Sequence, residues 1–275
     1  MRYFNTALTA LIDFIMTPLS VLGPPWTLFV ISMLAGVLML LIFRLTSNQA
    51  KIKEAKDKMQ AHLLEVLLFK NSPRIILSAQ KNLLRYNARY MRLAFTPMLF
   101  MILPVSLLLV HLDGWFGYRT LKTGESAIVS VKLSEEGPRL MSQISLEADK
   151  GLLVETPPLR IPETGEIDWR VRAEAPGDHY VTLRTADHTV QKKIIVSQTG
   201  FIRLSRSTVG SSIMDIILNP GDNPIEPGAF INKIEIGYPA REIKILGWRS
   251  HWLVLFFVIS VAGGFAFRKI MKTEI

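Results

Sequence analysis

The stretch WTLFVISMLAGVLMLLIF, residues 26–43, contains no charged residue. It is followed directly by Arg44, the first residue of the basic segment RLTSNQAKIKEAKDKMQ. A helix of about 20 apolar residues crosses the hydrocarbon core of a bilayer, so residues 26–44 are predicted to span a membrane. An arginine costs about 2.5–3.5 kcal/mol at mid-membrane but little where its side chain reaches water. Arg44 therefore has two interpretations: an anchor that sets topology, or a positive charge facing a water-filled groove between helices.

The positive charge of the chain is concentrated beside its apolar runs. The chain has 275 residues, of which 49% are hydrophobic, and a net charge of +9. Residues 44–92 hold eleven Lys and Arg against three acidic residues, whereas residues 113–249 hold 17 basic and 18 acidic residues. Cytoplasmic loops of membrane proteins are enriched in Lys and Arg, which explains this pattern without nucleic acid as a partner. Residues 44–92 and the tail, 269–275, are thus predicted to be cytoplasmic.

Two further spans are predicted at residues 93–112 and 248–268. The second span contains two prolines, which membrane helices tolerate. The third is short, and its Gly263 and Gly264 favour close helix packing. Indole rings are enriched at membrane interfaces, and four tryptophans lie at the predicted outer ends of the three spans: Trp26, Trp115, Trp248 and Trp252.

Residues 1–25 are predicted to form an amphipathic helix in the membrane interface. Polar residues recur every three or four positions, and apolar residues make up the opposite face. A cleaved signal peptide is the alternative interpretation. It requires a continuous apolar stretch, which Asp13 interrupts here. Pro24 and Pro25 end the helix before the first span. The polar stripe consists of Arg2, Thr6, Thr9, Asp13, Thr17 and Ser20.

Residues 45–92 are predicted to form a helical hairpin in the cytoplasm. The break is Asn71-Ser72-Pro73, in which Ser72 suits the N-cap and Pro73 the first helical position. Two helices lying flat on anionic lipid are the alternative, because their faces are basic. Each helix carries an apolar seam of the kind that pairs helices in coiled coils: Ile52, Ala55, Met59, Leu63 and Val66 in the first, and Ile76, Ala79, Leu83, Tyr86 and Tyr90 in the second.

Residues 118–247 are predicted to be an all-β, immunoglobulin-like sandwich outside the membrane. Turn signals such as Pro176-Gly177-Asp178 separate runs that alternate or are rich in β-branched residues. The predicted strands exceed one seven-strand unit, which leaves open one sandwich with an extension or two small β units. The strands are predicted at 126–133, 167–174, 179–186 and 190–197, and near 201–207, 214–218 and 231–236.

The fold class is therefore a membrane α-helical protein with three spans, an interfacial helix and a helical hairpin, carrying an all-β domain outside. No pattern predicts catalysis. The chain has no cysteine, which excludes disulfides and thiolate chemistry, and it lacks Gly-x-Ser-x-Gly and phosphate-loop patterns. Glu135-Glu136 is predicted to be a solvated turn. No cofactor, metal or enzyme activity is predicted, because the histidines are not spaced as metal ligands: His62, His111, His179, His188 and His251.

The order of these elements resembles the YidC / oxidase-assembly insertase superfamily over residues 1–118 and 248–275. Besides this architecture, the stretch from Phe43-Arg44 into the hairpin carries the resemblance. It implies a three-span core with a hydrophilic groove, a positive residue in that groove, and a hairpin that receives the client protein. By this resemblance Arg44 would be the positive residue, although it lies nearer the cytoplasmic end than a mid-groove charge. The β domain between the second and third spans also departs from bacterial members that carry a β domain before the core.

Two functions are predicted. The first is a membrane-protein insertase or chaperone of the YidC-like type, which guides short hydrophobic segments into the bilayer through a polar groove without nucleotide hydrolysis. Its candidate substrate-binding residues are Arg44, Ser32, Thr96, Ser106 and Ser260, although each hydroxyl could instead bond to its own helix. The alternative is a structural or assembly subunit of a bacterial envelope complex, which docks a partner through its β domain.

The predicted location is the bacterial inner membrane, with several spans. The N-terminus and β domain are expected outside, and the hairpin and C-terminus in the cytoplasm. The predicted partners are nascent or client membrane proteins and the lipid bilayer, with a translocon or envelope-complex subunits as further candidates and no nucleic acid.

Overall fold

The computed structural model describes residues 2–69, 71–134, 141–184, 189–210, 212–221, 224–226, 230–245, 247–271 and 273. The chain divides into two compact units, Met1–Thr27 with Leu107–Trp252, and Leu28–Ser106 with Leu253–Ile275. We call the first the β unit and the second the helical unit. The predicted turn at Glu135-Glu136 and His188 lie outside the described residues.

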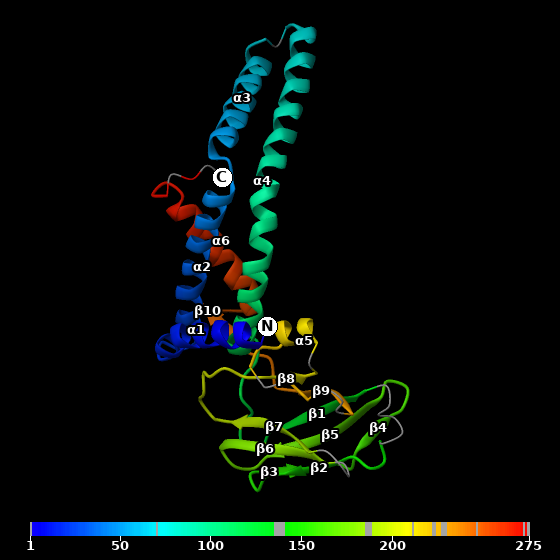
Figure 1. Ribbon diagram of the computed structural model, residues 1–275. Coiled ribbons are helices and arrows are strands. Elements are labelled where there is room, and N and C mark those ends of the chain that lie inside the picture. The colour runs from blue at the N-terminus through cyan, green and yellow to red at the C-terminus, as the bar shows by residue number, and fades with distance from the viewer. Residues whose placement is uncertain are drawn as a thin grey trace. The chain divides into compact units, whose positions relative to one another are not determined.

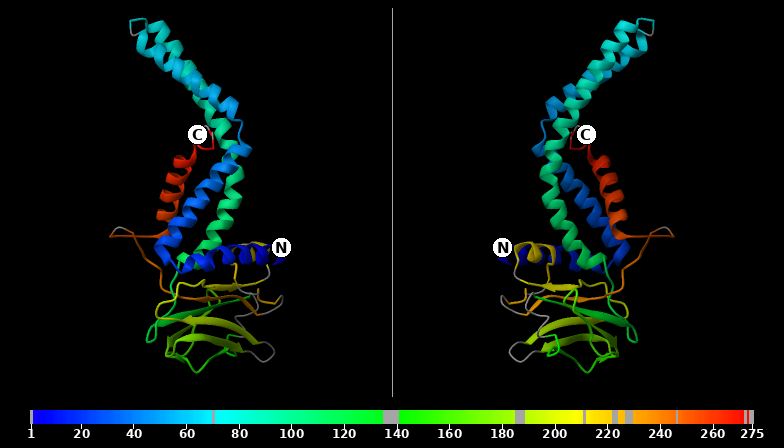
Figure 2. Two further views of the ribbon diagram at one scale, coloured as in Figure 1. Left: turned by 90° about the vertical axis from the view of Figure 1, so that its left-hand side faces the viewer. Right: turned by 90° about the vertical axis from the view of Figure 1, so that its right-hand side faces the viewer.

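Long apolar helices make up the helical unit (Figures 1 and 2). Helix α2, Pro24–Thr46, begins at the proline pair, because proline has a suitable φ for the first helical turn. Helix α4, Pro73–Phe116, has 44 residues and joins the second hairpin helix and the predicted second span without interruption. Helix α6, Trp252–Phe267, has 16 residues and is shorter than the predicted span 248–268. By length and composition, α2 and α4 could each cross a membrane.

Helix α3, Gln49–Leu68, runs beside the first part of α4. The Asn48 side chain caps α3 by accepting a hydrogen bond from the Lys51 N–H at 3.1 Å. His62 stacks on Tyr86 with ring centroids 5.6 Å apart, so the two helices are in direct contact. Three small or branched residues from the two predicted seams are buried: Ile52, Ala55 and Ala79.

Within the described residues, three antiparallel sheets form most of the β unit (Figure 1). The largest has the strand order β3-β5-β1-β9-β8, with β4 also paired to β5, and the others are β2-β6-β7 and β10-β11. The strands are β1 (Ser126–Leu133), β2 (Ser145–Ala148), β3 (Leu152–Val154), β4 (Leu159–Ile161), β5 (Glu166–Ala173), β6 (Gly177–Arg184), β7 (Thr189–Val196), β8 (Ser207–Val209), β9 (Ile231–Ile236), β10 (Ile243–Ile245) and β11 (Trp248–Ser250).

The two larger sheets share one hydrophobic core. Along β1, every second residue from Ala127 to Leu133 is buried, while the residues between them are exposed or half-buried. Trp169 on β5 is the register partner of Val129 and is itself buried. This alternation follows from the two-residue period of a strand. The sheets confirm the predicted β-structure for most of residues 118–247.

Residues 214–218, predicted as a strand, instead belong to helix α5, Ile213–Leu218. The helix ends at its C-cap, Asn219, whose N–H donates a hydrogen bond to the Asp215 carbonyl oxygen at 2.9 Å. Its isoleucines suggested a strand, but strand preference depends strongly on tertiary context, and here α5 contacts α1 (Figure 1). Residues 201–206, also predicted as a strand, have no regular secondary structure. Strands β2, β3, β4, β10 and β11 were not predicted.

Helix α1, Arg2–Ser20, leaves an apolar face exposed. Ile12 and Met16 are buried, whereas Leu11, Phe14 and Ile15 are exposed. The helix therefore uses one apolar strip for packing and presents another to its surroundings, a pattern typical of helices in a membrane interface.

Candidate functional site

An apolar cavity lies between α2, α4 and α6 in the helical unit. Its volume is about 360 Å³. Three flexible side chains, Met39, Met98 and Met101, contribute to its wall together with Phe43 and Tyr90. Methionine is unbranched and polarizable, and it adapts to ligands of different shape. The wall is therefore suited to apolar segments of varied sequence.

Glycines allow α2 and α6 to approach closely at this cavity. A Cβ on Gly36 would collide with the Ser260 backbone, and a Cβ on Gly263 would collide with the Met33 sulfur. By contrast, a Cβ on Gly264 would meet its nearest neighbour, the Gly36 carbonyl oxygen, at 3.6 Å. Small residues let the backbones of membrane helices pack tightly, and Gly36 is the position where this is strictly required.

The five predicted substrate-binding residues occupy different environments. Ser260 lines the cavity, and its hydroxyl donates to the Phe257 carbonyl at 3.1 Å. Ser32 is fully buried, and its Oγ has no hydrogen-bond partner among the described residues. Arg44, Thr96 and Ser106 are exposed and are not among the lining residues. The hydroxyls do not converge, and the methionine wall is the feature that the sequence analysis missed.

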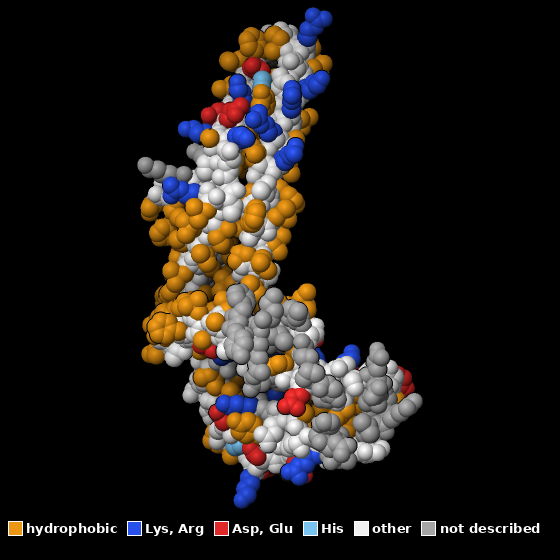
Figure 3. All heavy atoms as spheres, viewed as in Figure 1, with side chains coloured by type: hydrophobic (Ala, Val, Ile, Leu, Met, Phe, Trp, Pro, Cys, Tyr) orange, Lys and Arg blue, Asp and Glu red, His pale blue; other side chains and the backbone are white. Residues whose placement is uncertain are grey.

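Hydrophobic and basic side chains are separated along the helical unit (Figure 3). Hydrophobic side chains cover α2, α6 and the later part of α4, whereas Lys and Arg gather on α3 and the beginning of α4. Near the hairpin turn, Leu67, Leu68 and Phe69 are exposed. The hairpin thus presents apolar side chains at its tip within a basic surface.

In the β unit, Asp13 of α1 joins two elements that are distant in sequence. Its Oδ2 accepts a hydrogen bond from Arg203 Nη1 at 2.8 Å, and its Oδ1 accepts one from Trp115 Nε1 at 3.1 Å. One turn earlier on α1, Thr9 Oγ1 lies 3.2 Å from His111 Nε2. Part of the polar stripe of α1 is therefore engaged with the end of α4 and the segment before β8.

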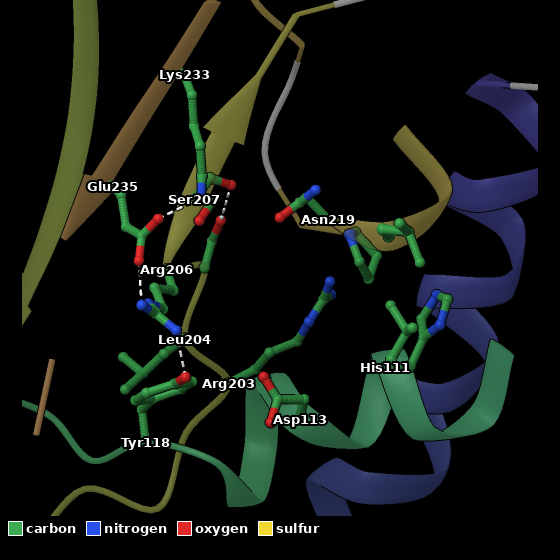
Figure 4. Close-up of a pocket in the computed structure, with 15 residues that line it drawn as sticks. His111, Asp113, Tyr118, Arg203, Leu204, Arg206, Ser207, Asn219, Lys233 and Glu235 are labelled. Atoms are coloured by element: carbon green, nitrogen blue, oxygen red, sulfur yellow. Dashed lines mark hydrogen bonds and ion pairs between the residues drawn. The ribbon is translucent and has the colours of Figure 1, made fainter. Parts of the chain in front are cut away.

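Arg203 also lines a polar cavity with a volume of about 220 Å³. Figure 4 shows its side chain extending from the segment before β8 into this cavity, between Asp113 of α4 and Asn219 after α5. A second cavity of about 250 Å³ also has Arg203 and Ser205 in its wall, together with Asp13 and Gly221. Arg203 and Ser205 thus line both cavities. We refer to the two cavities together as the polar cavity.

A network of charged side chains closes one side of the polar cavity (Figure 4). The Glu235 carboxylate accepts hydrogen bonds from both Arg206 and Lys233, and Arg206 also donates to the Tyr118 hydroxyl. Burial acts to raise the pKa of Glu235, but the hydrogen bonds from Lys233 and the charge of Arg206 outweigh it, so the pKa is lowered. Glu235 therefore stays ionised between its two cations.

The described residues contain no group of three or more His, Asp or Glu side chains that could hold a metal ion. The described histidines have other partners. His62 contacts Glu65 at 2.9 Å, and His179 Nε2 lies 2.8 Å from the Ala175 carbonyl oxygen. His111 lies 2.8 Å from the Leu107 carbonyl oxygen through Nδ1.

Comparison with known proteins identifies no family. No protein-family model matches the chain, and no curated protein matches it. Among solved structures, it is similar to domains 4 and 5 of the S-layer protein SbsC, with 16% sequence identity and a TM-score of 0.21. The alignment covers 30% of this chain and 48% of that one.

Proposed function

We propose that this chain is a multi-pass membrane protein that acts as an insertase or chaperone of the YidC-like type. The observation that carries the proposal is the methionine-lined apolar cavity between α2, α4 and α6, next to the end of α2 that bears Arg44. A client segment held there would keep its apolar side chains away from water before it moves into lipid, and apolar burial would drive that transfer.

The exposure of α4 supports a membrane location. Only 6% of the most apolar 18-residue stretch of α4 is buried, whereas the core helix of a soluble protein is mostly buried. Phe95, Leu99, Phe100 and Leu103 are all more than half exposed. An apolar surface of this extent marks a protein or membrane contact. In this proposal α4 crosses the bilayer over residues 93–112, and the β unit, an immunoglobulin-like sandwich, lies outside.

The short length of α6 favours a locally thin bilayer, which a client segment would cross more easily. Its 16 residues extend about 24 Å at 1.5 Å per residue, less than the roughly 30 Å of hydrocarbon in a typical bilayer. A short span is accommodated by local thinning of the bilayer. Thinning would also bring the middle of the bilayer, through which the polar flank of a client must pass, closer to Arg44 near the end of α2.

Crosslinking from two positions on α4 tests the proposal. A photoreactive amino acid at Met98 would report on the cavity, and one at Phe100, which is similarly exposed but does not line the cavity, serves as the matched control. We expect short-lived crosslinks to nascent membrane proteins from Met98 and lipid crosslinks from Phe100. Lipid alone at both positions, together with a stable partner captured from the β unit, would favour the alternative function of an envelope-complex subunit.

A further inference from the structure

The polar cavity of the β unit holds a buried arginine whose hydrogen-bonding capacity is incompletely used. The Arg203 side chain is 15% exposed, and its Nη1 donates to Asp13. Its Nη2 is buried and has no hydrogen-bond partner among the described residues. Leaving a buried charged donor unsatisfied is unfavourable, so an acceptor from outside the chain is expected at this atom.

Ser205 supplies a second donor beside Arg203. Lys192 is 1% exposed and donates from Nζ to Ser205 Oγ at 3.2 Å and to Thr208 Oγ1 at 3.0 Å. An ammonium group only donates, so the Ser205 oxygen accepts and its own O–H remains available to donate. The acceptor within reach in the described structure, the Ser207 carbonyl oxygen, is 3.5 Å away, which is long for a hydroxyl hydrogen bond.

Gly221 brings backbone without a side chain close to these two donors. A Cβ at this position would lie 3.1 Å from Arg203 Nη2 and 3.4 Å from Ser205 Oγ. The φ of Gly221 is +138°, which a residue with a side chain rarely adopts. A guanidinium and a hydroxyl around a side-chain-free wall form a donor set that suits a phosphate oxyanion.

We infer that the polar cavity binds the phosphate of a phospholipid headgroup. The choice of lipid over free phosphate rests on the proposed function, in which α4 leaves the bilayer at about residue 112. The cavity is lined by residues on both sides of that boundary, including His111 and Asp113. Met214 and Leu218 of α5 are exposed, and Leu218 lines the cavity. Acyl chains could therefore follow α5 while the phosphate meets Arg203.

The other charged groups of the cavity are compatible with one phosphate. Arg206 and Lys233 share the single carboxylate of Glu235, which leaves this side of the cavity with excess positive charge. Asp113 also lines the cavity and would oppose a second negative charge nearby. A headgroup with one phosphate fits this balance better than one with several.

Native mass spectrometry of the full-length protein in detergent would test the inference by titration with phosphatidylglycerol or phosphatidylethanolamine. Arg203→Lys keeps a positive charge for Asp13 but removes Nη2, and Ser205→Ala removes the second donor. Arg184→Gln is the charge control, because Arg184 is exposed and pairs with Glu147 on the β2-β6 edge. One lipid-binding event should weaken about tenfold in each cavity variant, as loss of a charge-assisted hydrogen bond implies, and should be unchanged in the control.

Equal lipid binding by the original protein, Arg203→Lys and Ser205→Ala, with unchanged near-UV circular dichroism, would overturn the inference. Thermal unfolding in inorganic phosphate separates the two sources of the oxyanion. Stabilisation by phosphate that depends on Arg203, without Arg203-dependent lipid binding, would reject the lipid headgroup. This phosphate measurement needs no membrane, whereas extraction of the protein from membranes by carbonate would contradict the proposed function, so the two failures are distinguishable.

Discussion

Asp13 and Arg203, 190 positions apart in the chain, form an ion pair in which Arg203 Nη1 lies 2.8 Å from Asp13 Oδ2. The second carboxylate oxygen of Asp13 accepts a hydrogen bond from Trp115. Asp13 is also the residue that interrupts the apolar stretch of the N-terminal helix. A charge that is costly in an apolar helix is thus accounted for by its role in attaching α1 to the rest of the β unit.

Asp13→Ala should therefore destabilise the β unit. The substitution leaves the mostly buried Arg203 and the Trp115 N–H without their acceptor, which costs about 1–3 kcal/mol for unsatisfied buried groups. Thermal unfolding followed by near-UV circular dichroism would measure the loss. Glu147→Ala is the comparison, because its pair with Arg184 is more than half exposed on both sides, and exposed pairs contribute about 0–1 kcal/mol. Equal effects of the two substitutions would contradict the structural role of Asp13.

Gly36→Ala should disrupt the packing of α2 against α6. Its Cβ would overlap the Ser260 backbone, and overpacking of this kind costs about 1–3 kcal/mol. Gly264→Ala is the matched control, because its Cβ would have an ordinary contact at 3.6 Å. Stability against unfolding in detergent and the yield of client insertion should both decrease in Gly36→Ala but not in Gly264→Ala. A Gly264→Ala defect as large as that of Gly36→Ala would show that the helices are not packed in this way.

The stability of the β unit should fall in acid as Glu235 and Glu125 become protonated. The Arg119 hydrogen bond lowers the pKa of Glu125, and Lys233 and Arg206 outweigh burial to lower that of Glu235. A carboxyl whose folded-state pKa is depressed stabilises the protein above its unfolded pKa, about 4.3 for Glu. That contribution is lost as the pH falls through the folded-state value.

The melting temperature of the protein should consequently decrease below about pH 4.3, starting near the unfolded-state pKa. Glu235→Gln should weaken this pH dependence, since glutamine does not titrate. Glu242→Gln is a suitable control, because the 3.6 Å contact of Glu242 with Arg249 joins two side chains that are both 65% exposed. A pH profile that is the same in Glu235→Gln as in the original protein would argue against a depressed pKa at this site.

The exposed tip of the hairpin should contribute to client capture. Leu67→Ser with Leu68→Ser removes two side chains that are 54% and 75% exposed, so little stability should be lost. Client crosslinking from the tip should decline several-fold if the tip holds apolar segments. Leu84→Ser provides the control, because Leu84 is 70% exposed on the α4 side of the hairpin. Undiminished crosslinking in the double variant would exclude these leucines as a contact.

Residues 120–238 of the β unit can be deleted because the two ends of this segment lie close together. The Arg119 N–H donates to the Pro239 carbonyl at 2.9 Å, and Tyr118 is bridged to Ala240, so the entry and exit of residues 120–238 lie side by side. A short Gly-Ser linker could replace this segment. An insertase should retain partial client insertion after the deletion, whereas a subunit that docks through the β domain should lose its partner. Complete loss of insertion with normal abundance would count against the proposed function.

The sequence was most informative where one pattern extends over many residues or where a charge bias is strong. The uncharged run 26–43 predicts α2, and the two-residue alternation of 126–133 predicts β1 with its observed bounds. The run 214–218 was misassigned, because five residues of mixed periodicity leave the choice between strand and helix to contacts with α1. Position in the chain also could not show that Ser32, Thr96, Ser106 and Ser260 occupy different environments, since side-chain convergence depends on helix rotation.

The amino-acid sequence alone is enough to establish the apolar helices, the charge asymmetry around them and the β-rich character of residues 118–247, because these depend on local pattern and composition. Only the tertiary structure reveals the methionine-lined cavity, the close approach at Gly36 and the joining of Asp13 to Arg203. These features bring together residues from separate elements. Their positions depend on how the elements pack, which no local pattern in the chain encodes.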